Sequence, residues 1–255
     1  MNFIYCFQAE WLKKKRSLSS WLIISGAFFT PTIVIIAKIV NSKSLYTTSI
    51  ANDYWENIWR SSWESMSIFL LPMTVILTSS LITQLEYKNN TWKQLHTVPQ
   101  RLTTIFFAKL FVIIVMIIQF FSLFNIGIYL SGVIPCLLKG IAYPIETIPY
   151  LLFFKENIKY FLECLPIISL QYLISLQFKN FLVPVGVGLA LWVLSIAVLS
   201  WKYGYLIPYT YCSLHYLKTV GRFNGNIIID FYAIGFFLLF LIVGYIMYLN
   251  KSEKG

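Results

Sequence analysis

The sequence contains several uninterrupted apolar runs of roughly twenty residues, separated by short polar stretches. A helix of about 20 residues crosses the roughly 30 Å hydrocarbon core of a bilayer, and its backbone groups pair within the helix itself. Hydrophobic residues make up 58% of the 255-residue chain and charged residues only 12%, less than in an ordinary soluble domain. The sequence therefore predicts an all-α integral membrane protein.

We expect six membrane-spanning helices in a single domain that covers residues 1–255. The predicted spans are 17–40, 66–85, 105–133, 158–177, 181–201 and 227–249. Four consecutive cations, Lys13 to Arg16, precede the first span, and such a cluster favours the cytoplasmic side. An even number of spans then places both termini in the cytoplasm, in a multi-pass protein of the cell membrane.

The connecting segments have patterns of their own. Apolar residues recur at helical spacing over residues 2–16, which predicts an N-terminal helix at the membrane interface with Trp11 as a headgroup anchor. The first span is expected to be retained, because no small-residue cleavage site follows it. The less apolar segments 134–157 and 202–226 are expected to be external and partly re-entrant.

Three tryptophans, Trp55, Trp59 and Trp63, recur at every fourth position before the second span. This spacing puts three indoles on one face of a helix. We interpret residues 41–64 as an external interfacial helix whose tryptophans lie among lipid headgroups. A contact with carbohydrate or peptide is the alternative interpretation.

A few polar side chains fall inside the predicted spans. Lys109 lies near the inner end of span three, where its amine is expected to snorkel to the interface. Gln119 and Asn125 lie deeper, and buried amides of this kind usually bond to neighbouring helices. Cys136 and Cys212 face outside in this topology, so a disulfide between them is conceivable, although buried thiols are favoured.

The formal net charge of +10 lies mostly in short loops beside the spans. Anionic lipid headgroups and the topology account for cations at such positions. No basic stripe with stacking aromatic residues occurs outside the spans. Membrane lipid is therefore an expected partner, and nucleic acid is not.

The sequence lacks the spacings of common catalytic and metal sites. It contains no GxxxxGK[ST], HExxH or GxSxG motif and no paired Cys/His spacing. The two histidines, His96 and His215, fall on opposite sides of the predicted membrane. Glu163 and Asp230 lie near span ends without an obvious partner. We expect a chain that is not an enzyme and that holds no metal or cofactor of its own.

An amphipathic stretch connects spans two and three. At about 100° per residue, Leu85, Trp92 and Leu95 gather on one side, while most polar residues gather on the other. A helix of this kind lies flat at the surface, with Trp92 as its anchor, and offers its polar face to the water. A plain interfacial loop without a partner explains the spacing equally well.

The middle of the predicted spans carries amides and hydroxyls but almost no charge. Ion-coupled transporters usually carry ionisable or discontinuous elements near the midplane. Any transport by this chain must therefore draw its energy from elsewhere. A stand-alone channel or a membrane scaffold without energy coupling is the alternative.

Two stretches carry a family resemblance. They are EWLKKKRS at 10–17, followed by Trp21–Leu22, and EYKNNTWKQL at 86–95, followed by Pro99 and Lys109. With the six spans, they resemble the permease subunits of ATP-binding cassette (ABC) exporters of the type 2 class. Within that class the chain is most similar to bacterial permeases for lantibiotic (antimicrobial-peptide) immunity.

The resemblance implies a half-transporter. Two such chains, identical or paired with a sister permease, would sit on two ABC ATPase subunits that bind ATP and magnesium. The segment after span two would be the coupling helix that docks into the ATPase, through Glu86, Lys88, Asn90, Thr91, Lys93 and Gln94. Lys88 and Thr91 fit this role less well, because they lie nearer the apolar side of the helix. The cargo implied is an exported peptide or lipid-like amphiphile.

Overall fold

The computed structural model describes residues 3–15, 17–41, 53–88, 101–141, 144, 146–223 and 228–252, except the side chains of 86–88 and 251–252. These residues are almost entirely helical, and no strand occurs among them. Five of the helices are long and apolar enough to cross a membrane. The predicted all-α membrane class is confirmed.

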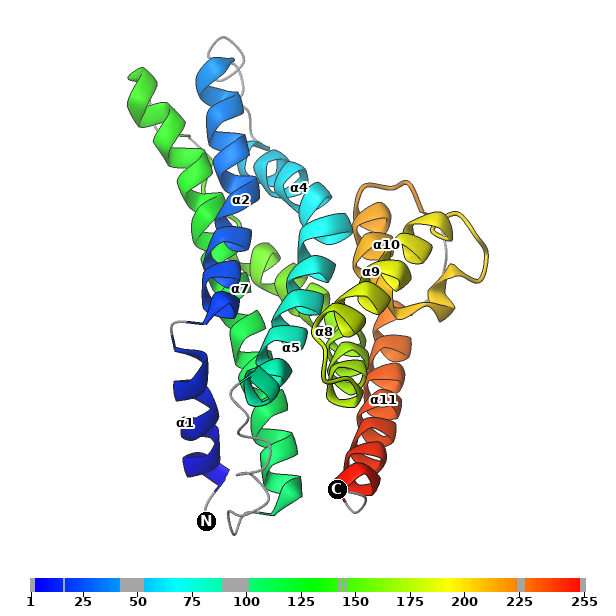
Figure 1. The fold of residues 1–255 in the computed structure, drawn as a ribbon. Helices are drawn as coiled ribbons and strands as arrows, with labels where there is room; N and C mark the ends of the chain where they lie inside the picture. The colour runs from blue at the N-terminus through cyan, green and yellow to red at the C-terminus, as the bar shows by residue number, and fades with distance from the viewer. Residues whose placement is uncertain are drawn as a thin grey trace.

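The first half of the chain forms a row of long helices. Helix α1 (Phe3–Lys14) precedes α2 (Leu18–Val40). Helix α4 (Tyr54–Ser65), the π-helical turn η1 (Met66–Leu70) and α5 (Leu71–Lys88) follow one another without a break. Helix α7 (Leu102–Lys139) packs along both α1 and α2 (Figure 1).

The second half of the chain packs around α8. The elements are α8 (Tyr150–Gln177), α9 (Leu182–Ala197), the 3-10 turns η2 (Gly204–Leu206) and η3 (Pro208–Thr210), α10 (Tyr211–Thr219) and α11 (Ile229–Ser252). Helix α11 runs along α8, and α5 packs on another side of α8. The start of α1 and the end of α11 lie at the same end of the bundle (Figure 1).

The segment predicted to be re-entrant at 134–157 differs in the structure. Residues 134–139 continue α7, and residues 150–157 are the first turns of α8. At 1.5 Å per residue the 38 residues of α7 extend about 57 Å, well beyond the hydrocarbon core. Pro135 indicates a helix break in the sequence, but a proline removes only one backbone hydrogen bond, and α7 continues past it. The helix ends at Gly140, whose φ of 64° is positive.

The predicted fifth span, 181–201, is shorter in the structure. Helix α9 stops at Ala197, and its 16 residues extend only about 24 Å. Residues 202–226 were expected to be a re-entrant or surface segment. In the described part of this segment, η3 and α10 fold back against α8, η2 packs on η3, and Tyr211, Cys212 and Leu214 are buried.

The headgroup interpretation of Trp55, Trp59 and Trp63 is wrong. Their side chains are at most 5% exposed and form part of the core. Trp59 stacks on Phe153, with ring centroids 4.3 Å apart, and Trp63 stacks on Tyr160 at 3.7 Å. A stripe of indoles on one helix face is equally suited to lipid or to protein, and here α7 and α8 supply aromatic partners.

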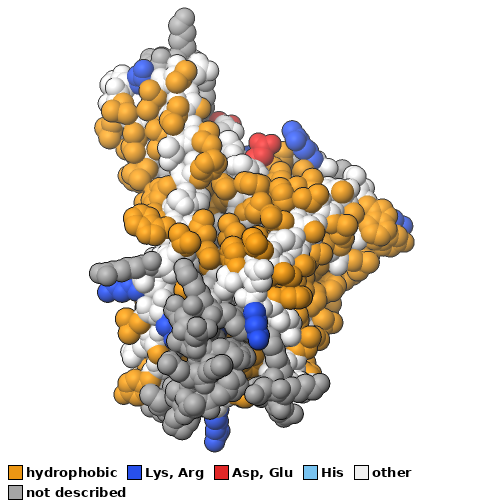
Figure 2. Space-filling model, in the orientation of Figure 1, with side chains coloured by type: hydrophobic (Ala, Val, Ile, Leu, Met, Phe, Trp, Pro, Cys, Tyr) orange, Lys and Arg blue, Asp and Glu red, His pale blue; other side chains and the backbone are white. Residues whose placement is uncertain are grey.

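Apolar side chains cover much of the outer surface. Figure 2 shows hydrophobic side chains spread over the middle of the visible face. Helices α2 and α11 contribute many of them, including Trp21, Ile36, Leu238 and Ile242, which are each about half exposed or more. Such a surface is stable in hydrocarbon but would be an aggregation hazard in water.

Candidate functional site

The predicted coupling segment lies between α5 and α7. The backbone of α5 extends to Lys88, so Glu86 and Lys88 fall in its last turn, and their side chains are not described. Asn90, Thr91, Lys93, Gln94 and the predicted anchor Trp92 lie outside the described residues. Their assignment therefore stays a prediction.

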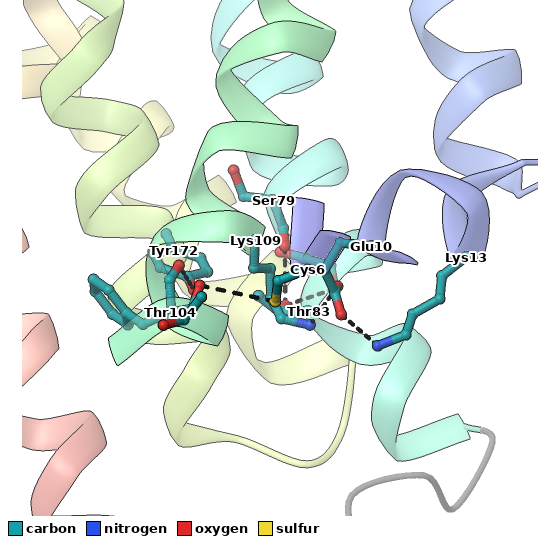
Figure 3. A network of polar contacts seen from close by, with 10 residues as sticks. Cys6, Glu10, Lys13, Ser79, Thr83, Thr104, Lys109 and Tyr172 are labelled. Carbon is teal, nitrogen blue, oxygen red and sulfur yellow. Dashed lines mark hydrogen bonds and ion pairs between the residues drawn. The ribbon is translucent and has the colours of Figure 1, made fainter. Parts of the chain in front are cut away.

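A buried polar network lies close to both ends of this segment. Figure 3 shows its members, which come from α1, α5, α7 and α8. At its centre the Nζ of Lys109 lies 3.2 Å from the Oε2 of Glu10, and the other carboxylate oxygen pairs with Lys13. The hydroxyl of Thr83, in the last turns of α5, donates to the carbonyl of Ser79. The ion pair of Glu10 with Lys109 joins the N-terminal helix α1 to α7, which follows the predicted coupling segment.

Burial makes the central pair of this network strong. Lys109 and Glu10 are 3% and 6% exposed at their side chains. Burial alone would raise the pKa of the Glu10 carboxyl, but the charges and hydrogen bonds of Lys109 and Lys13 outweigh it and lower that pKa below its ordinary value. Glu10 therefore stays ionised and holds α1 on α7.

The prediction that Lys109 snorkels to the interface is wrong, because its amine ends on Glu10 inside the protein. A signal for this pairing exists in the sequence. Lys109 is the one charged residue between 102 and 138, and Glu10 is the one acid before residue 50. A lone acid and a lone base in apolar surroundings stabilise each other when folding brings them together.

The predicted anchor Trp11 lies on the same helix. Its ring is half-buried against the core, and the Nζ of Lys14 sits 3.4 Å from the ring centroid. Burial lowers the pKa of Lys14 to about 8. The role of Trp11 as a headgroup anchor stays a prediction, and its observed contact is a cation–π pair within α1.

A second polar node connects four elements in the middle of the bundle. Gln171 of α8 donates to the hydroxyl of Ser80 in α5 at 3.1 Å and to the carbonyl of Pro184 in α9 at 2.8 Å. Its amide oxygen accepts from the hydroxyl of Tyr209 in η3 at 3.0 Å. A Cβ on Gly188 would lie 2.7 Å from that oxygen, so only glycine lets α9 approach this closely. Gln171 therefore links α5, α8, α9 and η3 through its three hydrogen bonds.

An apolar groove of about 710 Å³ lies between α7 and α8. Its polar groups are few and paired: Asn125 and Asn157 exchange two side-chain hydrogen bonds of 3.0 and 2.9 Å. The expectation that Asn125 bonds to a neighbouring helix is confirmed. The other predicted amide, Gln119, is exposed and accepts from Lys14 at 3.5 Å.

A third cluster involves residues for which the sequence offers no obvious partner. The Nε2 of His215 lies 2.8 Å from Glu156, and its Nδ1 lies 2.9 Å from Glu163. The expectation that Glu163 lacks a partner is therefore wrong. None of the four cysteines forms a disulfide, and all four are buried, as favoured from the sequence.

These features define a class. Several apolar helices, apolar side chains on the outer surface and polar side chains that hydrogen-bond between helices are typical of a multi-pass membrane protein. A family model described as ABC-2 family transporter protein matches residues 6–197 of the chain. The chain belongs to this family and is a membrane permease of an ABC transporter. Permeases of this family associate with ABC ATPase subunits and are typically not catalytic themselves. The comparisons with curated proteins and with solved structures give no match.

Proposed function

We propose that this chain is the permease half of an ATP-driven exporter of peptides or lipid-like amphiphiles. ATP and magnesium bind on separate ATPase chains, and a second permease, identical or a sister chain, completes the transporter in the cell membrane of a bacterium. Both termini and the coupling segment lie on the cytoplasmic side. The family membership of residues 6–197 is the observation that carries this proposal.

The buried contacts support a mechanical mechanism. A push on the coupling segment acts on α5 and α7, which that segment joins. The Glu10–Lys109 pair makes α1 follow α7, and the Gln171 node makes α8, α9 and η3 follow α5. Binding of ATP then shifts the population of the permease between closed and open states.

Charge reversal in the coupling segment tests the link to the ATPase. The permease is co-expressed with a candidate ABC ATPase, and the complex is purified through a tag on the permease. Glu86→Lys or Lys93→Glu is expected to reduce recovery of the ATPase about tenfold, while the permease alone keeps its unfolding midpoint. Lys218→Glu, an exposed change on α10, is the control. Unchanged recovery in both variants would refute the assignment.

The groove between α7 and α8 supports an amphiphilic cargo. Its walls are apolar, it holds an amide pair for a polar head, and both helices are long enough to span a membrane. A drug-sized ligand typically occupies about 300–1,000 Å³, and the groove falls in this range. A role in antimicrobial-peptide immunity would follow if such peptides are the cargo.

A bulky side chain in the groove tests this assignment. Binding of a fluorescent lipopeptide to the permease in nanodiscs is compared for Ile126→Trp, which narrows the groove, and Ile242→Trp on α11. Both isoleucines are about half exposed, so the two changes are matched in type and burial. We expect at least about tenfold weaker binding for the first variant alone, which equals about 1.4 kcal/mol. Equal binding by both variants would remove the groove as the cargo site.

A further inference from the structure

The cluster around His215 lies away from the coupling segment and is not used in the mechanism above. Helix α10 carries His215 and packs against α8, which carries Glu156 and Glu163 seven residues apart. Lys159, between the two acids, pairs with Glu156 at 2.8 Å. The aromatic ring of Tyr160 packs edge-on against the imidazole, with ring centroids 4.6 Å apart. The imidazole thus lies between two carboxylates of α8.

The Nε2 of His215 forms a hydrogen bond of 2.8 Å with Glu156, and its Nδ1 makes a charge contact of 2.9 Å with the Oε1 of Glu163. A neutral imidazole has only one N–H, so it can donate to only one of two ionised carboxylates. Two carboxylate oxygens within 3 Å of the same ring therefore favour one more proton, held by the imidazole or shared with a carboxyl group. Without that proton, the buried carboxylate of Glu163 and the partly buried carboxylate of Glu156 face a neutral ring, and one contact becomes repulsive.

Burial raises the cost of losing this proton. Glu163 is fully buried, and His215 is 7% exposed. With the proton, the charges of the cluster (Glu156, Glu163, Lys159 and His215) sum to zero. Without it, a net negative charge remains beside the fully buried Glu163, and separation of α10 from α8 relieves it.

Other ionisable groups near the cluster do not replace the proton. From α11, the carboxylate of Asp230 adds negative charge near Glu163. From α8 and α10, Cys164 and Cys212 are buried thiols, which are neutral at ordinary pH. The hydroxyl of Tyr209 in η3 is engaged with Gln171, and η1 carries no ionisable side chain. The proton on His215 therefore supplies the positive charge that offsets the carboxylates of Glu156 and Glu163.

The cluster has a route to the surface. A cavity of about 210 Å³ is lined by Glu156, Tyr160 and Thr219 and extends to the exposed Glu56–Arg60 pair of α4. Glu156 is thus the outward member of the cluster and Glu163 the inner one. Protons can exchange with the solution through this cavity without opening of the bundle.

We propose that Glu156, His215 and Glu163 form a proton-operated latch that fastens α10 to α8 when the cluster holds its proton and releases α10 when the proton leaves. Helix α10 also rests on η1 and η3. Since η1 leads into α5, release of α10 loosens the end of the bundle opposite the coupling segment. This consequence for transport rests on the proposed function, whereas the latch itself does not.

The direction of the pH effect follows from the contacts of His215. Burial opposes its charge, but the hydrogen bonds and charges of Glu156 and Glu163 outweigh burial and raise the pKa of His215 to about 9. A group whose pKa is raised in the folded protein stabilises the fold in full below its ordinary value, near 6.5 for histidine. This contribution is lost as the pH rises through about 9. The latch is therefore closed at neutral pH and opens in alkali.

The test measures the distance between α10 and α8 as a function of pH. Spin labels are placed at two exposed positions, Lys218→Cys on α10 and Leu151→Cys on α8, in the full chain in lipid nanodiscs. The four native cysteines are replaced by alanine, and pulsed electron resonance gives the distance distribution from pH 6 to 10. We expect one short distance at pH 7 and loss of most of that population by pH 10, above the pKa of His215.

Variants of the latch residues show whether loss of the proton on His215, and not general unfolding in alkali, separates α10 from α8. His215→Arg, a permanent cation, is expected to keep the short distance at pH 10, and His215→Gln to lose it at every pH. Glu163→Gln removes one carboxylate and is expected to lower the midpoint by about one unit or more. Glu56→Gln at the cavity mouth is the matched control and should leave the midpoint unchanged.

The pH dependence of the α10–α8 distance in the chain with native His215 tests the latch even if His215→Gln does not fold. A distance that stays constant from pH 6 to 10, or a midpoint that is the same in His215→Gln, would overturn the latch. ATPase recovery with the permease is measured in parallel. A titrating latch without a bound ATPase would refute the proposed function alone, and a bound ATPase without titration would refute the latch alone.

Discussion

Trp192 of α9 donates its indole N–H to the carbonyl oxygen of Ile68 at 2.8 Å. Ile68 lies in η1, four residues before Pro72. Because proline has no N–H, this carbonyl lacks its usual helical donor. The indole N–H therefore replaces the backbone donor that Pro72 lacks, and this hydrogen bond joins α9 to η1.

Trp192→Phe keeps the aromatic ring but removes the donor. We expect a loss of about 1–3 kcal/mol in unfolding free energy, because the carbonyl is left without a partner. In a Pro72→Ala background the loss should be smaller, since alanine supplies a backbone N–H. Reversible unfolding in mixed micelles measures both, with the exposed Trp201→Phe as control. Equal losses in the two backgrounds would contradict this account.

The Glu10–Lys109 pair gives a second prediction. Removing one partner, as in Glu10→Gln or Lys109→Met, should cost about 3–5 kcal/mol, because the other charge stays buried without compensation. The double variant should recover part of this loss. The exposed pair Glu56–Arg60 is the contrast, and Glu56→Gln should cost less than about 1 kcal/mol. Additive effects at Glu10 and Lys109 in a double-mutant cycle would show that the two residues act separately.

Glycines in the spanning helices give a matched comparison. A Cβ on Gly132 of α7 would lie 2.4 Å from the ring of Trp55, whereas one on Gly235 of α11 would meet nothing within 4 Å. Gly132→Ala should therefore destabilise the chain by about 1–3 kcal/mol. Gly235→Ala should be neutral or stabilising, by up to about 1 kcal/mol. Unfolding midpoints of the two variants compare them directly, and the opposite order would argue against the packing of Trp55 on α7.

The amide pair Asn125–Asn157 should behave as one unit. Each amide also donates to a carbonyl in its own helix, so neither is left without a bond when its partner is lost. Asn125→Leu and Asn157→Leu should each destabilise the chain, and the double variant should cost less than their sum. The coupling energy expected for a polar pair between membrane helices is about 0.6–1.7 kcal/mol. A coupling energy near zero would mean that α7 and α8 are held together by apolar packing alone.

The apolar runs determined the membrane class and the approximate positions of the helices, because a backbone in hydrocarbon must pair its own polar groups. The polar pattern after the second span predicts a coupling segment, and this assignment stays a prediction. The ends of the helices depend on packing as well as on sequence. Pro135 and the polar residues after 133 suggested a break, but packing against α2 and α4 carries α7 on to Lys139.

Only the tertiary structure decided which polar and aromatic side chains pair. Periodicity shows that Trp55, Trp59 and Trp63 share a face, but protein and lipid are equally apolar, so the pattern does not tell which one they meet. Lys109 finds Glu10 across 99 positions, and His215 finds its carboxylates across more than fifty. A charge buried in a membrane protein is stabilised by its partner in space, and that partner is fixed only when the helices pack.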